Sequence, residues 1–331
     1  MAITVGGLVA PWIPVGYLPE LQLLSTALPF WVPVWAFWTW RSIRLRSWKL
    51  IVASLFGLVA CGWIALGDIS FSGQTEPDHT SIKIVSFNVG TFDFKENNIK
   101  EVGELIQQYH PDLVAMQEFR NQDVEEGEKA LTYLANMWGL PNKDFLHLPF
   151  HVHGAAFFSR YPILKIDTLF LPRDEINSGI LITVDTDLGP IGIANVHFSS
   201  FHIKAIYDKE PDLQGKVGGI QSRARKALSL QQEKVEIVLE KLKNYPYPVI
   251  IAGDLNATPH SRIVRQLADQ YQDSFQEAGY GRGWSFPVFG PFGIRIDYQF
   301  ASHNLQPISH QVIRNKVSDH FPLLGTYQLK Q

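Results

Sequence analysis

Cysteine is almost absent from this sequence, since Cys61 is the single cysteine among 331 residues. A disulfide within the chain is therefore excluded, and so is a zinc site built on cysteine pairs. The sequence also has no HExxH motif, no internal repeat and no low-complexity segment. Its formal net charge is −3, so it lacks the basic excess that is typical of a general polyanion-binding protein.

Charged residues are scarce in the first 70 positions. Glu20 is the single charged side chain in residues 1–40, and residues 21–40 and 50–67 carry no charge. Because about 20 apolar residues cross a bilayer, we expect transmembrane helices over about 21–40 and 50–67, together forming a membrane anchor in residues 1–67. A buried hairpin in a soluble core is the alternative. A cleaved signal peptide is disfavoured, because no basic segment precedes the long apolar run.

The segment between the two apolar runs, RSIRLRSWK at 41–49, carries four basic residues. The positive-inside rule places this loop in the cytoplasm. The second span then exports the rest of the chain, as in a multi-pass protein of a bacterial inner membrane whose large domain is periplasmic or extracellular. Residues 68–80 are small and polar and are expected to form a linker. Whether residues 1–19 add a third span stays open.

The remaining segment, 81–331, alternates strand-like and helix-like stretches. Helical spacing of apolar residues predicts helices over 97–109 and 220–243. Apolar runs rich in β-branched and aromatic residues predict strands at 82–89, 112–118, 154–160, 180–186, 191–198, 248–256, 295–301 and 322–329. This mixture predicts an α/β sandwich.

Polar side chains that can bind a metal ion or move a proton recur at the ends of these strands. They are Asn88, Glu118, Asn195, His197, Asp254, Asn256, Asp319 and His320, with Asp297 inside a further strand. One Asp or Asn after a strand is usually a turn former, but a set of this size indicates a shared pocket. The carboxylate and amide oxygens in it suit Mg²⁺ or Mn²⁺ rather than Zn²⁺.

Six short segments in this order resemble the motifs of the endonuclease/exonuclease/phosphatase superfamily. They are SFNVG, AMQEF, NVHFSS, AGDLNATP, RIDYQF and SDHFPL. The resemblance covers about residues 82–330, and the ordered set is far more specific than any one motif. It implies two packed mixed β-sheets flanked by helices, a four-layer α/β sandwich, with the site at one edge.

The resemblance implies a metal site for a divalent cation, Mg²⁺ or Mn²⁺. Glu118 in AMQEF matches the glutamate that binds the catalytic metal. Asn88 in SFNVG matches the asparagine that helps to hold the metal and the phosphate. Asp319, which precedes His320, is expected to be a metal ligand or to support one.

The resemblance also implies the catalytic residues of a phosphoester hydrolase, in which water attacks phosphorus in line with the leaving oxygen. Asp254 matches the aspartate that orients or deprotonates this water, and Asn256 matches the amide that contacts the phosphoryl oxygens. His320 matches the histidine that stabilises the pentacovalent phosphorus, and Asp297 matches its aspartate partner. His197 matches a histidine near the leaving oxygen.

The substrate stays open between a phosphodiester and a phosphomonoester. A lipid head group suits a site near a bilayer. Binding of nucleic acid by a nuclease draws on a basic surface. Residues 71–331 instead hold 25 basic and 30 acidic residues, a net charge of −5. Nucleic acid is therefore the second choice, and a non-catalytic binding module that retains the fold is the third. No obligate protein partner is indicated.

Two segments beside the expected site bear on specificity. The insertion 202–222 is either a substrate-selecting loop or an ordinary surface loop. The segment 281–293 is rich in glycine, proline and aromatic residues. Its aromatic side chains are expected either to line the rim of the site or to pack under the sandwich, and they are Trp284, Phe286, Phe289 and Phe292.

Overall fold

The computed structural model describes residues 1–13, 19–76, 80–90, 96–120, 124–145, 153–171, 177–201, 213–289 and 292–330. The chain divides into two compact units. The smaller unit comprises Met1–Ile69, Ser200–Val235 and Ala257–Gln266, and the larger unit comprises Ser70–Ser199, Glu236–Asn256 and Leu267–Gln331.

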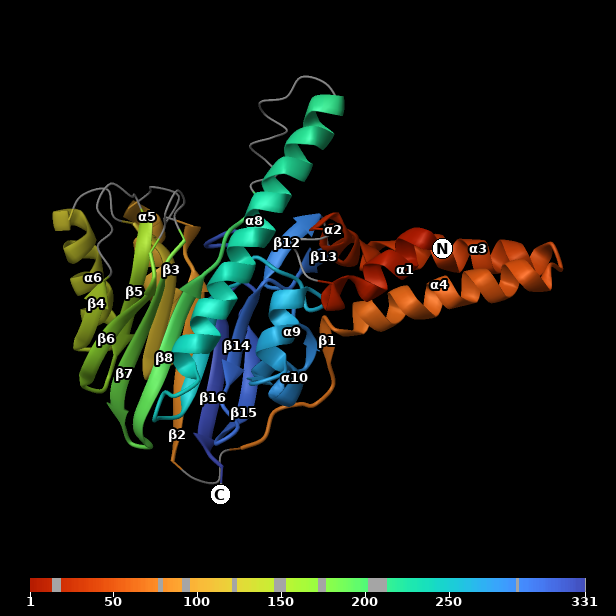
Figure 1. Ribbon diagram of the computed structural model, residues 1–331. Coiled ribbons are helices and arrows are strands. Elements are labelled where there is room, and N and C mark those ends of the chain that lie inside the picture. Colours follow the sequence, from red (N-terminus) through yellow and green to blue (C-terminus); the bar gives the residue numbers. More distant parts are fainter. Residues whose placement is uncertain are drawn as a thin grey trace. The chain divides into compact units, whose positions relative to one another are not determined.

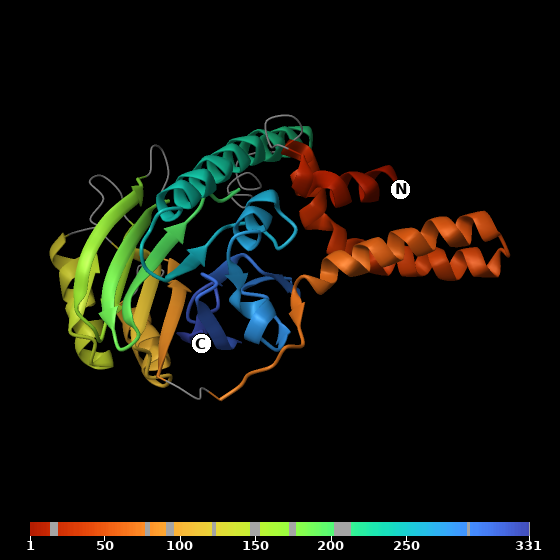
Figure 2. The ribbon, with the colours of Figure 1, turned by 60° about the horizontal axis from the view of Figure 1, so that its bottom comes forward.

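Two six-stranded sheets face each other in the larger unit (Figures 1 and 2). One of them, here called the β2 sheet, has the strand order β15-β16-β2-β3-β5-β4. Its strands are β2 (Ser81–Asn88), β3 (Leu113–Arg120), β4 (Asn142–Phe145), β5 (His153–Ser159), β15 (Leu305–Val312) and β16 (Leu323–Leu329). Because β2 and β3 are parallel and the other pairs antiparallel, the sheet is mixed.

The second sheet, here called the β9 sheet, has the order β10-β14-β9-β8-β7-β6. Its strands are β6 (Ile163–Phe170), β7 (Gly179–Thr186), β8 (Gly189–His197), β9 (Val249–Asp254), β10 (Gln272–Asp273) and β14 (Asp297–Ala301). Only β8 and β9 run parallel among its pairs. The fold class is therefore confirmed as two packed mixed sheets.

The main core lies between the sheets and follows the period-2 alternation of strands. Ile82 and Ile84 of β2 pack in one buried cluster with Ile250 and Ala252 of β9. The intervening residues of β2 point the other way, and Val85 belongs to a second cluster. The last inward-facing residues of β2 and β9 are polar rather than apolar. The two sheets therefore present polar groups to each other where these strands end.

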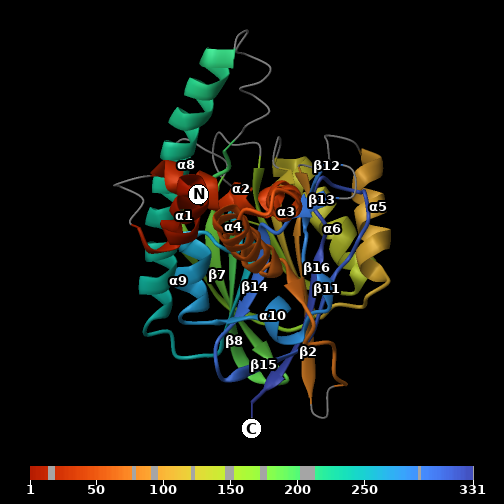
Figure 3. The same cartoon turned by 90° about the vertical axis from the view of Figure 1, so that its right-hand side faces the viewer.

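Helices α5 (Glu96–Gln107) and α6 (Val124–Trp138) lie together on the outer side of the β2 sheet (Figure 3). Val102 and Ile106 of α5 and Leu134 of α6 share the second core cluster with the outward residues of β2 and β3. The expected helix 97–109 corresponds to α5. Short elements complete this unit, namely α10 (Ser274–Ala278), β11 (Gly281–Arg282), β12 (Phe286–Phe289) and β13 (Phe292–Ile294).

Residues 70–76, which lie in the segment expected to be a linker, are hydrogen-bonded into the larger unit. The hydroxyl groups of Ser70 and Ser72 donate to the carbonyl of Gln276. The Gly73 N–H donates to the carbonyl of Gly279. These contacts fix the entry of the chain into the domain.

The smaller unit is mostly helical in its described parts. Its N-terminal segment contains α1 (Ala2–Val9), the 3₁₀ turn Ala10–Trp12, α2 (Pro19–Ala27), the 3₁₀ turn Leu28–Trp31, α3 (Val32–Arg44) and α4 (Trp48–Leu66). Helices α3 and α4 form an antiparallel hairpin (Figure 1), in which Gly57 leaves room for the ring of Trp35. Helix α8 (Leu213–Leu242) begins in this unit and ends in the larger one, and α9 (Arg262–Ala268) does the same.

The first expected transmembrane helix, over 21–40, is wrong as one continuous helix. The chain there forms α2, a 3₁₀ turn and α3 in succession. Pro29 and Pro33 explain the breaks, because proline lacks the backbone N–H of a helix and clashes with the preceding turn. In the described parts of the chain, one helix is long and apolar enough to cross a membrane, Trp48–Leu66.

Candidate active site

Three of the expected site residues lie in one row across the β9 sheet. Asp254 ends β9, where it pairs with His197 of β8 on one side and with Asp297 of β14 on the other. Residues opposite each other on adjacent strands point to the same face. The sheet register therefore brings together three side chains that are separated by up to 100 positions.

Asn88, at the end of β2, meets this row from the opposite sheet. Its amide group donates to Asp254 Oδ2 at 3.0 Å and to Glu118 Oε1 at 3.2 Å. The side-chain oxygen Oδ1 of Asn88 accepts the Gly90 N–H at 3.0 Å. Asn88 therefore links the carboxylates of the two sheets.

Glu118 reaches the site because β3 contains a bulge. Between Met116 and Phe119, three steps along β3 match two steps along β5, and Glu118 has a φ of 54°. Met116 and Phe119 both point into the outer core cluster, so one residue is inserted into the alternation. Without it, Glu118 would point toward the outer helices instead of toward Asn88.

The two histidines flank Asp254. His197 Nε2 lies 3.6 Å and His320 Nε2 lies 3.7 Å from Asp254 Oδ2. His197 Nε2 is also 3.5 Å from Glu118 Oε1. His320 Nδ1 is 2.9 Å from Oδ2 of Asp297, which fixes the orientation of the ring.

Asn256 follows β9 in a tight turn with a φ of 49°. Its backbone N–H donates to Asp254 Oδ1 at 2.8 Å, and its amide group donates to Asp254 Oδ2 and to the carbonyl of Phe198. The preceding Gly253 allows the close approach of β8, because a side chain there would overlap the carbonyl oxygen of Val196. The turn therefore holds the Asp254 carboxylate from its own strand.

Asp319 lies at the edge of this cluster and is exposed. The Asp319 carboxylate accepts a hydrogen bond from the Ser318 hydroxyl. The same hydroxyl is also within hydrogen-bonding distance of the backbone carbonyl of Asn88. The negative charge of Asp319 contributes to the raised pKa of His320. The structure thus brings Asp319 beside the Asn88–Gly90 segment, at the edge of the cluster around Asp254.

The cluster carries an excess of negative charge. Burial, together with the charge of Asp297, raises the pKa of Asp254 to about 8. Burial opposes protonation of His320, but the charges of Asp297 and Asp254 outweigh it and raise the pKa of this imidazole to about 10. Glu118 adds a further carboxylate. The positive charge of protonated His320 therefore does not neutralise the carboxylates of the cluster.

These residues fit a hard divalent cation by charge and by donor type. Asp254, Asp297 and His320 offer ligand atoms within 4.8 Å of one another. His320 Nδ1 is already hydrogen-bonded to Asp297, however, so this trio is also a proton-sharing array. Glu118, whose side chain is 25% exposed, and Asn88 provide oxygen donors on the open side of Asp254.

The residues that support these groups carry little signal in the sequence. Ser285 accepts the backbone N–H groups of Ile296 and Asp297 at 3.2 and 3.0 Å. The ring of Phe286 lies edge-on to His320, with centroids 4.9 Å apart. Phe286 belonged to the expected aromatic rim, whereas Ser285 carried no signal of its own.

A second supporting pair crosses between the sheets. Gln117 Nε2 donates to Asn195 Oδ1 at 2.7 Å, and the Asn195 amide donates to the carbonyls of Met116 and Ala156. Both side chains are buried. Asn195 had been grouped with the polar strand ends, but it braces the bulged strand rather than joining the cluster around Asp254.

Part of the expected specificity loop lies outside the described residues, namely 202–212. The rest of it, 213–222, forms the first turns of α8, so the helix begins before the expected residue 220. The side chain of Phe289 also lies outside the described residues. Phe292 is exposed and its ring lies 6.1 Å from that of Trp284.

The comparison with family models identifies the domain. The model described as "Endonuclease/Exonuclease/phosphatase family" matches residues 85–320, which contain the whole cluster. The chain belongs to the endonuclease/exonuclease/phosphatase family. Members of this family are generally phosphoester hydrolases. A search of curated proteins found no match.

Solved structures of the endonuclease/exonuclease/phosphatase family share this fold. A member from Bacteroides vulgatus is 16% identical and gives a TM-score of 0.58, with 76% of this chain and 100% of that chain covered. A member from Beutenbergia cavernae is 20% identical and gives 0.54, with 76% and 72% covered. Danio rerio TDP2, complexed with a single-strand DNA product, is 16% identical and gives 0.56, with 76% and 100% covered. Identities this low establish the fold alone.

Proposed function

We propose that this protein is a divalent-metal-dependent phosphoester hydrolase that is anchored in a membrane and acts outside the cytoplasm. The observation that carries the catalytic part is the convergence on Asp254 of Asn88, Glu118, His197 and His320. These side chains come from both sheets and lie within 3.7 Å of a neighbouring member of the cluster. A scaffold protein that had lost its activity would have no need to keep this charged group buried.

In this proposal Glu118 and Asn88 hold the cation, which we take to be Mg²⁺ or Mn²⁺, with Asp319 at the edge of its site. When bound, such a cation neutralises charge that develops on the phosphoryl and leaving oxygens. It also lowers the pKa of Asp254 below the value of about 8 that burial and Asp297 impose.

The protein groups then have separate tasks. Asp254 accepts a proton from the attacking water, and Asn256 contacts a phosphoryl oxygen while holding Asp254 in place. His320, kept protonated by Asp297, donates a hydrogen bond to the phosphoryl group as negative charge grows on it. His197, on the other side of Asp254, lies ready to protonate the leaving oxygen.

The membrane part of the proposal is supported by the surface of the α3–α4 hairpin. Val52, Val59 and Trp63 of α4 are 61%, 66% and 70% exposed, and Phe37 of α3 is 56% exposed. Large apolar side chains that stand out along two adjacent helices suit hydrocarbon better than water. The basic segment 41–49, which comprises the end of α3, the turn and the start of α4, favours a cytoplasmic position for this tip.

The catalytic test uses the full chain purified in detergent, with bis-p-nitrophenyl phosphate as a generic phosphodiester. We expect turnover with Mg²⁺ or Mn²⁺ and none in excess EDTA. The variant H320A should lose at least about 10²-fold in kcat, as is typical for loss of one such stabiliser. Hydrolysis at the same rate in EDTA, or an H320A enzyme with normal kcat, would refute the assignment.

The substrate test compares sphingomyelin, isoprenoid phosphates, DNA and RNA with the same preparation. A lipid phosphoester is our first choice, because the site belongs to a chain with an apolar N-terminal hairpin and a domain of net charge −5. Nucleic acid is the second candidate, favoured by the DNA product bound to the TDP2 neighbour. Turnover of DNA or RNA with no lipid hydrolysis would reverse this order.

The location is tested with cysteine labelling in intact cells. With Cys61 replaced by alanine, a single cysteine at Lys330 should react with a membrane-impermeant maleimide added from outside the inner membrane. A cysteine at Arg44, in the basic segment, should react only after the cells are lysed. The opposite pattern would place the catalytic domain in the cytoplasm.

A further inference from the structure

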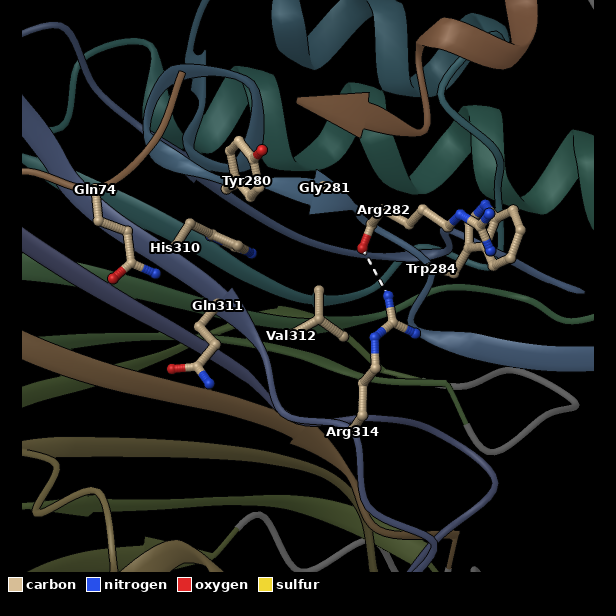
Figure 4. Close-up of a pocket in the computed structure, with 9 residues that line it drawn as sticks. All are labelled: Gln74, Tyr280, Gly281, Arg282, Trp284, His310, Gln311, Val312 and Arg314. Carbon is tan, nitrogen blue, oxygen red and sulfur yellow. Dashed lines mark hydrogen bonds between the residues drawn. The ribbon is translucent and has the colours of Figure 1, made fainter. Parts of the chain in front are cut away.

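A pocket of about 500 Å³ opens in the larger unit, and none of the cluster residues around Asp254 lines it (Figure 4). Its lining includes Arg282 of β11, Trp284 and Arg314, as well as His310 from the edge strand β15. It lies toward the end of the β2 sheet that carries the active site, because Val312 at the end of β15 pairs with Leu323, three residues after His320. The pocket and Asn88 therefore lie toward the same end of the β2 sheet.

Two solvent-exposed arginines, Arg282 and Arg314, line this pocket. Arg314 Nη2 donates to the backbone carbonyl of Arg282 at 2.8 Å, as Figure 4 shows. Arg282 lies over the ring of Trp284, with its Cζ 4.7 Å from the ring centroid. Burial and the nearby Arg282 charge both lower the pKa of Arg314. The two like charges repel each other, and a bound anion would relieve the repulsion.

Neither arginine forms an ion pair with a carboxylate of the described residues. Within the described part of the chain, no carboxylate lies within 4.0 Å of either guanidinium, in contrast to the buried Arg295, which is paired with Asp273. The described residues that line the pocket include no aspartate or glutamate. In a domain with a net charge of −5, this is a local excess of two positive charges.

The remainder of the lining is neutral and suits an organic group. Burial, reinforced by Arg295, lowers the pKa of His310 to about 3, so this ring is uncharged at neutral pH. It is 2% exposed, and within the described residues its Nδ1 has no hydrogen-bond partner. Tyr280, which is 73% exposed, and the amides of Gln74 and Gln311 complete the wall.

We propose that this pocket is an accessory site for a second phosphate group of the substrate. Arg282 and Arg314 bind the phosphate oxygens, since guanidinium groups match phosphate in geometry and charge. Trp284 and Tyr280 contact the organic part that joins this phosphate to the scissile one. Trp284 is well placed for this, because it directly precedes Ser285 and Phe286, which contact Asp297 and His320. The assignment of the phosphate to the substrate rests on the proposed function, whereas the anion site itself does not.

The binding test uses the full chain in detergent with excess EDTA and inorganic phosphate as the probe in isothermal titration calorimetry. Without a divalent cation the carboxylates around Asp254 repel phosphate, so the arginine pocket is the site that remains. We expect saturable binding by the wild type that is weakened at least about tenfold in R282Q/R314Q, since the variant loses the charge-assisted hydrogen bonds of both guanidinium groups.

A matched control removes two positive charges elsewhere in the same sheet. Lys143 lies on β4, the opposite edge strand from β15, and Lys330 follows β16 at the far end of its pairing with β15. The variant K143Q/K330Q should bind phosphate as the wild type does. Thermal unfolding of all three proteins checks that they are folded. No binding by the wild type, or equal weakening in both variants, overturns the proposal.

A kinetic test decides whether the phosphate belongs to the substrate. Thymidine 5′-(p-nitrophenyl phosphate) is compared, in the presence of Mg²⁺, with the same compound carrying a 3′-phosphate. R282Q/R314Q should raise KM about tenfold for the doubly phosphorylated probe and leave kcat for both probes unchanged.

Each outcome of this test has a distinct meaning. An unchanged KM for both probes, with phosphate binding lost in calorimetry, overturns the substrate assignment and leaves a site for free phosphate. Failure of the wild type to hydrolyse either probe, when bis-p-nitrophenyl phosphate is also not turned over, counts against the proposed function and not against the anion site.

Discussion

His320 and Asp297 form a buried pair, with Nδ1 of the histidine 2.9 Å from Oδ2 of the aspartate. Asp297 lies inside β14 and His320 just before β16, so the pair joins the β9 sheet to the β2 sheet. The aspartate both orients the ring and favours its protonated form.

Replacing Asp297 by asparagine should impair catalysis through His320. The amide keeps the size of the side chain but removes the charge that, with Asp254, holds the pKa of His320 near 10 against the effect of burial. We expect kcat to fall by about 10²-fold and the alkaline limb of the pH–rate profile to move to lower pH. The partly exposed Asp167, which pairs with Lys165 on β6, provides the control D167N. An unchanged alkaline limb in D297N would contradict the coupling.

Glu118 should govern the affinity for the metal. In E118Q the Mg²⁺ concentration that gives half-maximal activity should rise by about tenfold or more, since loss of groups around a metal typically costs 10–100-fold in affinity. Glu125, an exposed residue of α6 paired with Lys129, gives the matched control E125Q. The Mg²⁺ titration of each variant after EDTA treatment measures this. Identical titrations for E118Q and the wild type would remove Glu118 from the metal site.

Gly253 should tolerate no side chain. It has a φ of 148°, and an added methyl group would overlap the backbone carbonyl of Val196 in the neighbouring strand. Both strands are central, so we expect G253A to lower the free energy of unfolding by about 4 kcal/mol or more. G218A is the control, because Gly218 is helical with open space around it and alanine favours a helix by up to about 1 kcal/mol. Circular dichroism melting curves compare them, and a G253A protein as stable as the wild type would refute the steric argument.

His310 should make the protein sensitive to acid. Its pKa is lowered by burial and by Arg295 to about 3 in the folded state, against about 6.5 in an unfolded chain. Between these values the unfolded state binds more protons, so stability falls as pH falls, by up to about 1.4 kcal/mol per pH unit. Above pH 6.5 the group has no effect. In H310Q the loss of stability between pH 6.5 and 3 should be smaller, as measured by denaturant unfolding across that range. A slope equal to that of the wild type would contradict this.

The elements that were missed from the sequence have identifiable causes. β15 contains Pro307, which argues against a strand, yet it is an edge strand with an irregularity between Pro307 and Ser309. β6 is likewise an edge strand, and its burial is partial. Edge strands bury one face at most, so their sequences carry a weaker apolar signal than β2 or β9.

The site itself was foreseen as a set of residues and not as a geometry. Six of the nine expected residues form the cluster around Asp254, and Asp297 joins them through His320. Asp319 stays at the edge, and Asn195 braces the bulged strand instead. The motif residues lie at strand ends, where sequence patterns are readable. The second pocket was not foreseen, because Arg282 and Arg314 belong to different segments and neither lies in a recognisable motif.

The sequence by itself determined the family, the apolar strands and the polar residues that follow them, because these depend on local pattern and on the identity of short motifs. Only the tertiary structure decided that Glu118 turns inward at a bulge with a φ of 54°, and that His197, Asp254 and Asp297 stand in one row. Register and bulges are fixed by pairing between strands that are far apart in the chain, and a one-residue shift reverses the direction of a side chain. The placement of Arg282 and Arg314 at one pocket was decided in the same way, by packing that no local pattern encodes.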